Sequence, residues 1–305
     1  MAIKLDKKLK KRLLFWMIII LISLLSIPLI IFDLKISKSI PATWSKSWFS
    51  LIFDQIGIGI IFIPIYFLLL IFVLTINYSL IKTKKNKQII YWLFNIIYLL
   101  INVLFFYYND SFNFKKDSKE SLYKLVGSLV CILVSFIFYF SLNMYIYKKK
   151  LYKDVYWLSN ISSKTGYAFF VIFFSQITVQ LLKVIFGRLR PDEVINSNKD
   201  FYYAFEPNFS SSRGNSFPSG HTLSASLLFV FLFFFYLPNK KTQVLKIITI
   251  LTASIVTLLV GISRITMLDH FASDVYFSIV ILFIYMYYSK SVVNWFRKKI
   301  RPRNL

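Results

Sequence analysis

Long, uninterrupted apolar runs constrain this chain more than any other feature of its sequence. Hydrophobic residues fill 57% of its 305 positions, and several runs reach about 20 residues, the length of a helix that crosses the hydrocarbon core of a membrane. The runs are continuous, whereas strands of a membrane β-barrel alternate in polarity and span only about 10 residues. The sequence therefore predicts an all-α, polytopic membrane helical bundle. The expected spans lie near 13–32, 57–81, 88–107, 125–147, 166–187, 219–237, 247–263 and 274–289.

The distribution of basic residues predicts how these spans are oriented. The net charge of +24 is typical of nucleic-acid-binding proteins, but here Lys and Arg cluster beside the spans, as in membrane proteins with positive cytoplasmic loops. With a cytoplasmic N-terminus, 24 of the 37 Lys and Arg residues fall on cytoplasmic segments, 12 fall on outer segments, and Lys183 lies within a span. We therefore expect cytoplasmic N- and C-termini, a location in the bacterial inner membrane, and no nucleic-acid partner.

The expected spans divide the chain into an N-terminal transmembrane part, residues 1–147, and a second part, residues 148–305. The first apolar run has no small-x-small cleavage site, which predicts a retained helix rather than a cleaved signal peptide. Between the first two spans, Trp44 and Trp48 recur at helical spacing. This pattern predicts a short interfacial helix near 41–56, which either anchors the chain or guides a lipid.

The end of the span near 166–187 carries polar residues that a lipid-embedded helix does not need. Gln180, Lys183 and, seven residues later, Arg190 share one helical face, and Pro191 is expected to end the helix. A lysine in hydrocarbon is costly, so it either reaches to the interface or serves a function. Lys183 and Arg190 are suited to hold one anion together, whereas Arg188 points elsewhere and is a weaker candidate.

A second polar string opens the span near 219–237. We expect Pro218 in the first turn of this helix, with Asn215 or Ser216 as its cap, followed by Ser219, Gly220 and His221. The start of a helix presents unpaired backbone amides and the positive end of its dipole, both of which favour phosphate. Gly220 allows the backbone to come close to such a ligand.

A third polar string joins the last two expected spans. The chain has only two histidines, His221 and His270, and His270 is preceded by Arg264 and followed four residues later by Asp274. On a helix His270 and Asp274 share a face, so the carboxylate can hydrogen-bond the imidazole and fix its tautomer. The predicted topology places all three strings on the outer side of the membrane. Such a set of cations, imidazoles and one carboxylate indicates a phosphate-ester site.

The three strings together closely resemble the signature motifs of the type 2 phosphatidic acid phosphatases, a superfamily that includes the vanadium haloperoxidases. The resemblance covers residues 183–274 and implies a core of six helices with two additional N-terminal spans. It rests on Lys183 with Arg190 and Pro191, on Pro218-Ser219-Gly220-His221, and on Ser263-Arg264 with His270 and Asp274.

The resemblance also implies a role for each of these residues. His270 would attack phosphorus as a nucleophile oriented by Asp274, and His221 would protonate the leaving oxygen and later activate water. The phosphate would be bound by Lys183, Arg190, Ser219, Gly220 and Arg264. Three cations can replace the metal ions of other phosphatases, and no metal-ligand set or cofactor motif is visible, so we expect a metal-independent enzyme without cofactors.

A site at the outer end of a helical bundle predicts an amphiphilic substrate with its chains in the lipid. The candidates are phosphatidic acid, phosphatidylglycerol phosphate, polyprenyl diphosphate and the phosphorylated glucosamine of lipid A. The loop at 192–216, with Arg213, slightly favours a large polar head group. Two alternatives remain open: a lipid-linked phosphotransferase with the same phosphohistidine, and a non-enzymatic transporter or assembly protein.

Overall fold

The computed structural model describes residues 7–109, 119–197, 199–235 and 239–300, and these residues form helices with no strand. The α-helices are α1 (Lys7–Lys38), α2 (Trp48–Gly59), α3 (Phe62–Ser79), α4 (Lys84–Tyr108), α5 (Lys119–Lys148), α6 (Val155–Phe186), α7 (Pro191–Asn196), α8 (Gly220–Ser226), α9 (Lys240–Thr266) and α10 (Ala272–Ile300). Short 3₁₀ segments lie at Ala42–Lys46, Leu151–Lys153 and Leu227–Phe234. The prediction of an all-α polytopic bundle is confirmed.

Seven helices in the described parts of the chain are long and apolar enough to cross a membrane. They are Ile20–Lys38, Trp48–Ser79, Lys84–Tyr108, Lys119–Lys148, Val155–Asn196, Lys240–Thr266 and Ala272–Lys299. The eighth expected span, near 219–237, is the shorter apolar helix Gly220–Phe234, formed by α8 and the 3₁₀ segment that continues it. The chain is thus an integral membrane protein, whereas its division at residue 148 stays a prediction.

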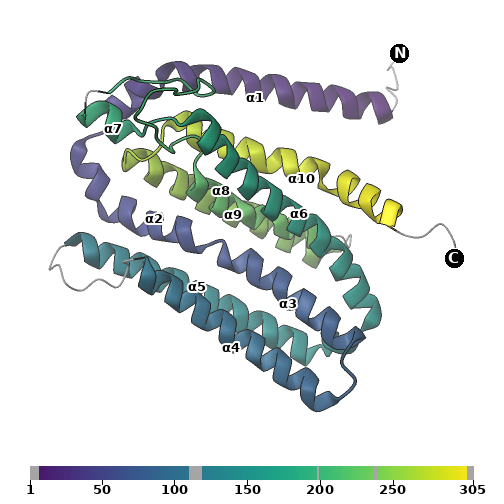
Figure 1. Ribbon diagram of the computed structural model, residues 1–305. Coiled ribbons are helices and arrows are strands. Elements are labelled where there is room, and N and C mark those ends of the chain that lie inside the picture. Colours follow the sequence, from purple (N-terminus) through teal and green to yellow (C-terminus); the bar gives the residue numbers. More distant parts are fainter. Residues whose placement is uncertain (1–6, 110–118, 198, 236–238, 301–305) are drawn as a thin grey trace.

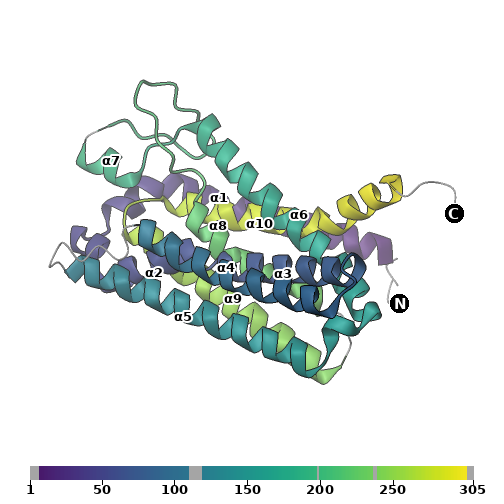
Figure 2. The same cartoon turned by 60° about the horizontal axis from the view of Figure 1, so that its bottom comes forward.

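The helices lie side by side in one bundle (Figure 1). Helix α2 packs against α5 and α9, α10 packs against α6 and α8, and α1 lies along α10. Helices α4 and α5 form the side of the bundle remote from α1. The segment that follows α6, including α7, covers the end of the bundle where α6 ends and α10 begins (Figure 2).

Helix α2 differs from the interfacial helix expected near 41–56. The expectation suits the 3₁₀ segment Ala42–Lys46, where Trp44 is exposed, but from Trp48 onward the chain enters the bundle. Asp54 and Gln55 are buried, and α2 leads with only a short interruption into α3. Aromatic spacing alone predicted a surface helix, because the sequence does not show that the polar face of α2 meets polar groups of other helices.

Asparagines in α4 and α5 bond across the bundle. The Tyr66 hydroxyl donates to Asn95 Oδ1 at 2.5 Å, and Asn143 Nδ2 donates to the Tyr66 hydroxyl at 2.5 Å. Asn102 Nδ2 donates to the Tyr139 hydroxyl at 3.0 Å. Polar side chains between membrane helices join them in this way, because lipid offers no other partner. These bonds hold α3, α4 and α5 together and lie away from the three motif strings.

Candidate active site

The first motif string lies at the end of α6. Gly187 ends this helix in the left-handed conformation, with φ of 54°, and its N–H donates to Lys183 O at 3.0 Å. This is the usual role of glycine at a helix C-cap. The expectation that Lys183 and Arg190 share one helical face was wrong, because Arg190 lies beyond the cap and Pro191 begins α7 instead of ending α6. The turn nevertheless keeps Lys183 within electrostatic reach of Arg190, Arg264 and Asp274.

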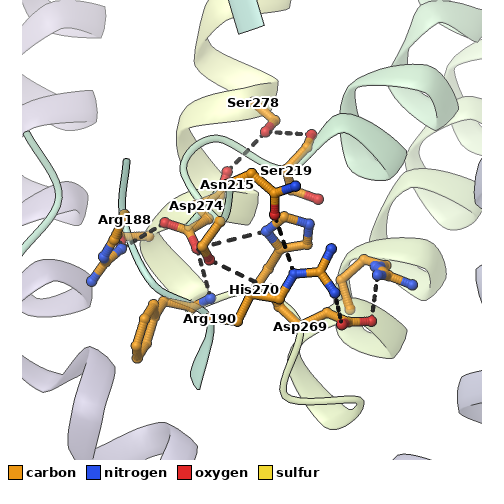
Figure 3. Close-up of polar contacts among 12 residues, drawn as sticks. Arg188, Arg190, Asn215, Ser219, Asp269, His270, Asp274 and Ser278 are labelled. Atoms are coloured by element: carbon orange, nitrogen blue, oxygen red, sulfur yellow. Dashed lines mark hydrogen bonds and ion pairs between the residues drawn. The ribbon is translucent and has the colours of Figure 1, made fainter. Parts of the chain in front are cut away.

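The second string begins α8, one residue later than expected. Ser219 is the N-cap and its Oγ accepts from Thr222 N–H at 3.4 Å, so Pro218 precedes the cap and neither Asn215 nor Ser216 caps the helix. The Ser219 carbonyl accepts from Ser278 Oγ at 2.8 Å, which ties the start of α8 to α10 (Figure 3). A Cβ on Gly220 would lie 3.7 Å from Lys183 Nζ. The lysine ammonium and the backbone at Gly220 therefore face each other.

The third string places His270 in the turn before α10 and Asp274 in the first turn of that helix. His270 therefore does not share a helical face with Asp274, and that expectation was wrong, but its Nδ1 still lies 3.7 Å from Asp274 Oδ2. His270 is only 2% exposed. Asp274 Oδ2 also accepts from Ser216 Oγ at 2.5 Å and from Phe271 N–H at 2.9 Å. The carboxylate is fixed from three sides, and the Nε2 edge of His270 is turned away from it.

Arg188, judged the weaker candidate from the sequence, is the main partner of Asp274. Its guanidinium donates to Asp274 Oδ1 at 2.6 Å and to Asp33 Oδ2 of α1 at 3.0 Å, and it is only 1% exposed. The same group lies 4.0 Å from the centre of the Phe271 ring, a cation–π contact. Asp33 accepts from Ser273 N–H at 2.9 Å. A buried Asp33–Arg188–Asp274 chain therefore supports the carboxylate that faces His270.

Acidic side chains also form ion pairs with two of the arginines that were expected to bind phosphate. Asp269 accepts from Arg190 Nη1 at 2.8 Å and, through its other oxygen, from Arg264 Nη2 (Figure 3). Arg264 Nη1 donates to Asp54 of α2, and both of these side chains are buried. His221 Nε2 lies 3.4 Å from the same Asp54 oxygen. Arg190, Arg264 and His221 are thus joined through two carboxylates.

Three of these residues escaped the sequence reasoning, namely Asp33, Asp54 and Asp269. The signal that could have found the first two is a carboxylate within or beside a membrane span, which is rare unless it pairs with a cation. Asp33 and Asp54 are 155 and 210 residues away from their arginine partners. The sequence offered no way to choose those partners. Asp269 precedes His270 directly, and no spacing in the sequence distinguishes it as a partner of Arg190 and Arg264.

The burial of His270 sets its protonation state. Removal from water lowers the pKa of His270 from its ordinary value of 6.5, and the neighbouring Asp274 opposes this change only in part. Asp274 stabilises the imidazolium, but burial has the larger effect. The resting imidazole is therefore neutral at neutral pH, with a lone pair available on one ring nitrogen.

We expect this shift to make stability depend on pH in a way that His270→Gln removes. In the unfolded chain the imidazole takes up a proton near pH 6.5, whereas in the folded protein it stays neutral to lower pH. The free energy of unfolding of the wild type should therefore fall relative to the variant as pH drops from about 7 to about 5, by at most about 1.4 kcal/mol per pH unit. Unfolding of both proteins in detergent micelles measures the difference. A difference that is constant with pH would contradict the assignment.

The loop after α7 corrects the expectation for Arg213. This side chain donates to the carbonyls of Val184 at 2.5 Å and Ile185 at 3.2 Å, at the end of α6, and to Asn208 O at 2.7 Å. Arg213 therefore satisfies helix-end carbonyls and holds the loop on α6, which explains it without a head group. An open cavity of about 400 Å³ lies over Arg190 and is lined also by Asp192, Glu193, Arg213, Gly214 and Asn215.

The structure thus brings the expected site residues to one end of the bundle. His270 with Asp274, His221 with Arg264, and Lys183 with Gly220 are each neighbours, and Asp269 joins Arg190 to Arg264. Ser219 is buried, and its Oγ lies 2.9 Å from Thr222 Oγ1. Within the described residues, no group of three or more His, Cys, Asp and Glu side chains is placed to hold a metal ion.

Comparison with known proteins finds one family model that matches the part of the chain with the three motif strings. Residues 164–298 match the family model described as the PAP2 superfamily. Comparisons with curated proteins and with solved structures give no significant match. The matched segment starts before Lys183 and ends after Asp274, so it contains all three motif strings but neither Asp33 nor Asp54. Residues 164–298 are therefore assigned to the PAP2 superfamily.

Proposed function

We propose that this protein is a membrane phosphatase that hydrolyses a phosphomonoester or diphosphate of a lipid through a phosphohistidine, without a metal ion. Membership of the PAP2 superfamily supports a phosphatase-type activity. The observation that carries the proposal is the placement of His270, backed by Asp274, at the same end of the bundle as His221 and three cations.

The proximity of His270 Nδ1 to Asp274 supports different tasks for the two ring nitrogens of His270. Nδ1 faces Asp274 and carries the proton, so Nε2 carries the lone pair that attacks phosphorus. As the N–P bond forms, the bond from phosphorus to the leaving oxygen breaks, and its electron pair goes to that oxygen. His221 gives this oxygen a proton. In the second step His221 takes a proton from water, whose oxygen attacks phosphorus and releases phosphate from Nε2.

The cations bind the phosphate oxygens and stabilise charge that develops in both steps. Lys183 faces the backbone at Gly220, and Arg190 and Arg264 face each other across Asp269. Asp269 therefore pairs with both guanidinium groups. An entering phosphate has to share these donors with Asp269 or displace it, which favours a doubly charged phosphate over weaker anions. Ser219 and the Gly220 amide complete the proposed phosphate site.

The surroundings of the site support a lipid as the substrate. The site lies at one end of a bundle whose helices expose large apolar side chains along their length, and the open cavity over Arg190 is polar. A phosphate on a lipid can therefore reach the site while its chains stay beside the helices. Phosphatidic acid, phosphatidylglycerol phosphate, polyprenyl diphosphate and lipid A are the candidate substrates.

The test is release of inorganic phosphate by the purified protein in detergent micelles that contain each of these four lipids and a chelator. We expect release from at least one lipid, inhibition by vanadate, and no loss with chelator. Release only after an acceptor lipid is added would indicate the phosphotransferase instead. No turnover of any lipid, with or without acceptor, would overturn the proposal and favour a non-enzymatic role.

We further propose that the site faces the outside of the bacterial inner membrane and that both termini are cytoplasmic, which rests on the excess of Lys and Arg on the opposite segments. The described part of the chain has one cysteine, Cys131, which is buried, so single added cysteines can be labelled selectively. In intact cells, we expect a membrane-impermeant maleimide to label Phe209→Cys, which replaces a side chain 85% exposed at the site end, but not Lys153→Cys. The reverse labelling pattern would invert the topology.

A further inference from the structure

Asp54 of α2 is a buried carboxylate inside the site that lies outside the family-matched segment. It is 8% exposed, accepts from Arg264 Nη1, and places the same oxygen 3.4 Å from His221 Nε2. It therefore touches both a phosphate-binding cation and the proposed proton donor. Helix packing does not require either contact, because apolar side chains of similar volume would fill the same space without loss of stability.

Helix α2 is built to approach His221 closely. A Cβ on Gly57, three residues after Asp54, would lie 3.1 Å from His221 Cβ, 3.3 Å from His221 Cδ2 and 2.8 Å from Val260 Cγ1. Only a residue without a side chain lets the α2 backbone come so near. The Ser50 hydroxyl lies 2.7 Å from Thr266 Oγ1 of α9. This bond holds the start of α2 against the helix that carries Arg264.

The second side of α2 is fixed by α5. Gln55 Nε2 donates to Asp54 Oδ2 at 3.2 Å, and its Oε1 accepts from Ser128 Oγ of α5 at 3.2 Å. Asp54 is thus held through its second oxygen while its first oxygen faces Arg264 and His221. The carboxylate has one orientation, and that orientation is set by three helices.

The imidazole of His221 presents two different edges. Nε2 is buried, has no hydrogen bond and faces Asp54, while the side chain as a whole remains 27% exposed. Nε2 is therefore the nitrogen that the protein encloses, and Nδ1 is the nitrogen left for the substrate. The other charged or titratable groups near His221 and Asp54 are mostly cations. The cations are Arg264, Lys183, Arg190 and Lys124, and the remaining two groups are Asp269 and His270.

We propose that Asp54 is a positioning residue that holds the Nε2 proton of His221, so that α2 completes the active site. This inference rests on the proposed function. Surrounded by cations, an imidazolium would lose its proton readily, and the carboxylate counters this. When the bond to the leaving oxygen breaks, the Nδ1 proton passes to that oxygen. His221 is left as the neutral tautomer, with its remaining proton on Nε2 facing Asp54.

Comparison of two leaving groups tests this assignment. An alkyl phosphate, such as octyl phosphate, needs a proton on its leaving alkoxide, whereas 4-nitrophenyl phosphate releases a stable phenolate that needs none. For Asp54→Asn we expect kcat/KM to fall about 100-fold with octyl phosphate and less than about 3-fold with 4-nitrophenyl phosphate. Asp54→Glu should recover part of the loss with octyl phosphate. The ratio kcat/KM reports the first step only, so the later attack of water does not obscure the comparison.

Asp154→Asn is the matched control, because Asp154 is the N-cap of α6 at the end of that helix remote from Lys183, and asparagine caps a helix equally well. This substitution should leave kcat/KM unchanged for both substrates. Equal losses with both substrates in Asp54→Asn would show a structural role alone and overturn the proposal. If Asp54→Asn does not fold, Gly57→Ala, which displaces α2 from His221, should give the same selective loss, and an unselective one overturns the proposal. Failure of the proposed function is a separate outcome, because the wild type itself would then release phosphate from none of the lipids.

Discussion

Replacing His270 by alanine should lower phosphate release by about 10⁴-fold or more, because no other side chain can take over the covalent step. His221→Ala should lower release from a lipid by about 10²- to 10⁴-fold, the usual contribution of a general acid and base. The two variants therefore differ in kind. His221→Ala can still form the phosphohistidine, whereas His270→Ala cannot. Initial rates of phosphate release in micelles measure both effects.

Trapping the intermediate separates loss of the nucleophile from loss of the fold. Acid-labile label from ³²P-labelled 4-nitrophenyl phosphate, whose leaving group needs no proton, should appear on the wild type, accumulate on His221→Ala, and be absent from His270→Ala. The buried imidazole fills space beside Phe271 and Asp274, so His270→Gln is the better control for folding, and it should be equally inactive. Full activity of either His270 variant would contradict the proposed mechanism.

The sequence predicted the spans, and the position of each motif string at a helix end, because both follow from local patterns. Apolar runs of sufficient length have to be helical in lipid, and spacing within one string placed Lys183, His221 and His270 at helix ends. The predictions that used helical geometry across those ends were wrong. Gly187 ends α6 before Arg190, and the turn before α10 contains His270, so these pairs meet through turns rather than along one helical face.

The parts of the site that could not be predicted come from the N-terminal helices. The resemblance suggested two additional spans without a role, yet α1 supplies Asp33 to Arg188 and α2 supplies Asp54 to Arg264. A buried arginine in a membrane protein requires a counter-charge. The sequence shows that each buried arginine needs a carboxylate partner, but it does not show which distant carboxylate that is. The packing of α1 and α2 determines the partner. The N-terminal helices are thus part of the support of the site.

Replacing Arg188 by alanine should destabilise the protein by about 3–5 kcal/mol, because two buried carboxylates then face each other without a counter-charge. Arg188 pairs with Asp33 at 3.0 Å and Asp274 at 2.6 Å, and all three side chains are almost fully enclosed. The midpoint of thermal unfolding in micelles measures the loss. Lys241→Ala, at an exposed position in the first turn of α9, is the matched control and should leave the midpoint unchanged.

A second substitution distinguishes lost charge pairing from lost packing around Arg188. In the Arg188→Ala background, Asp33→Asn removes one of the two unpaired carboxylates, so the double variant should be more stable than Arg188→Ala alone. In the wild-type background the same substitution breaks a charge-assisted hydrogen bond and should destabilise. The sign of the effect of Asp33→Asn therefore reverses with the partner present or absent. If Asp33→Asn destabilises both backgrounds equally, Arg188 stabilises the protein through its contacts with the Phe271 and Phe201 rings rather than through charge.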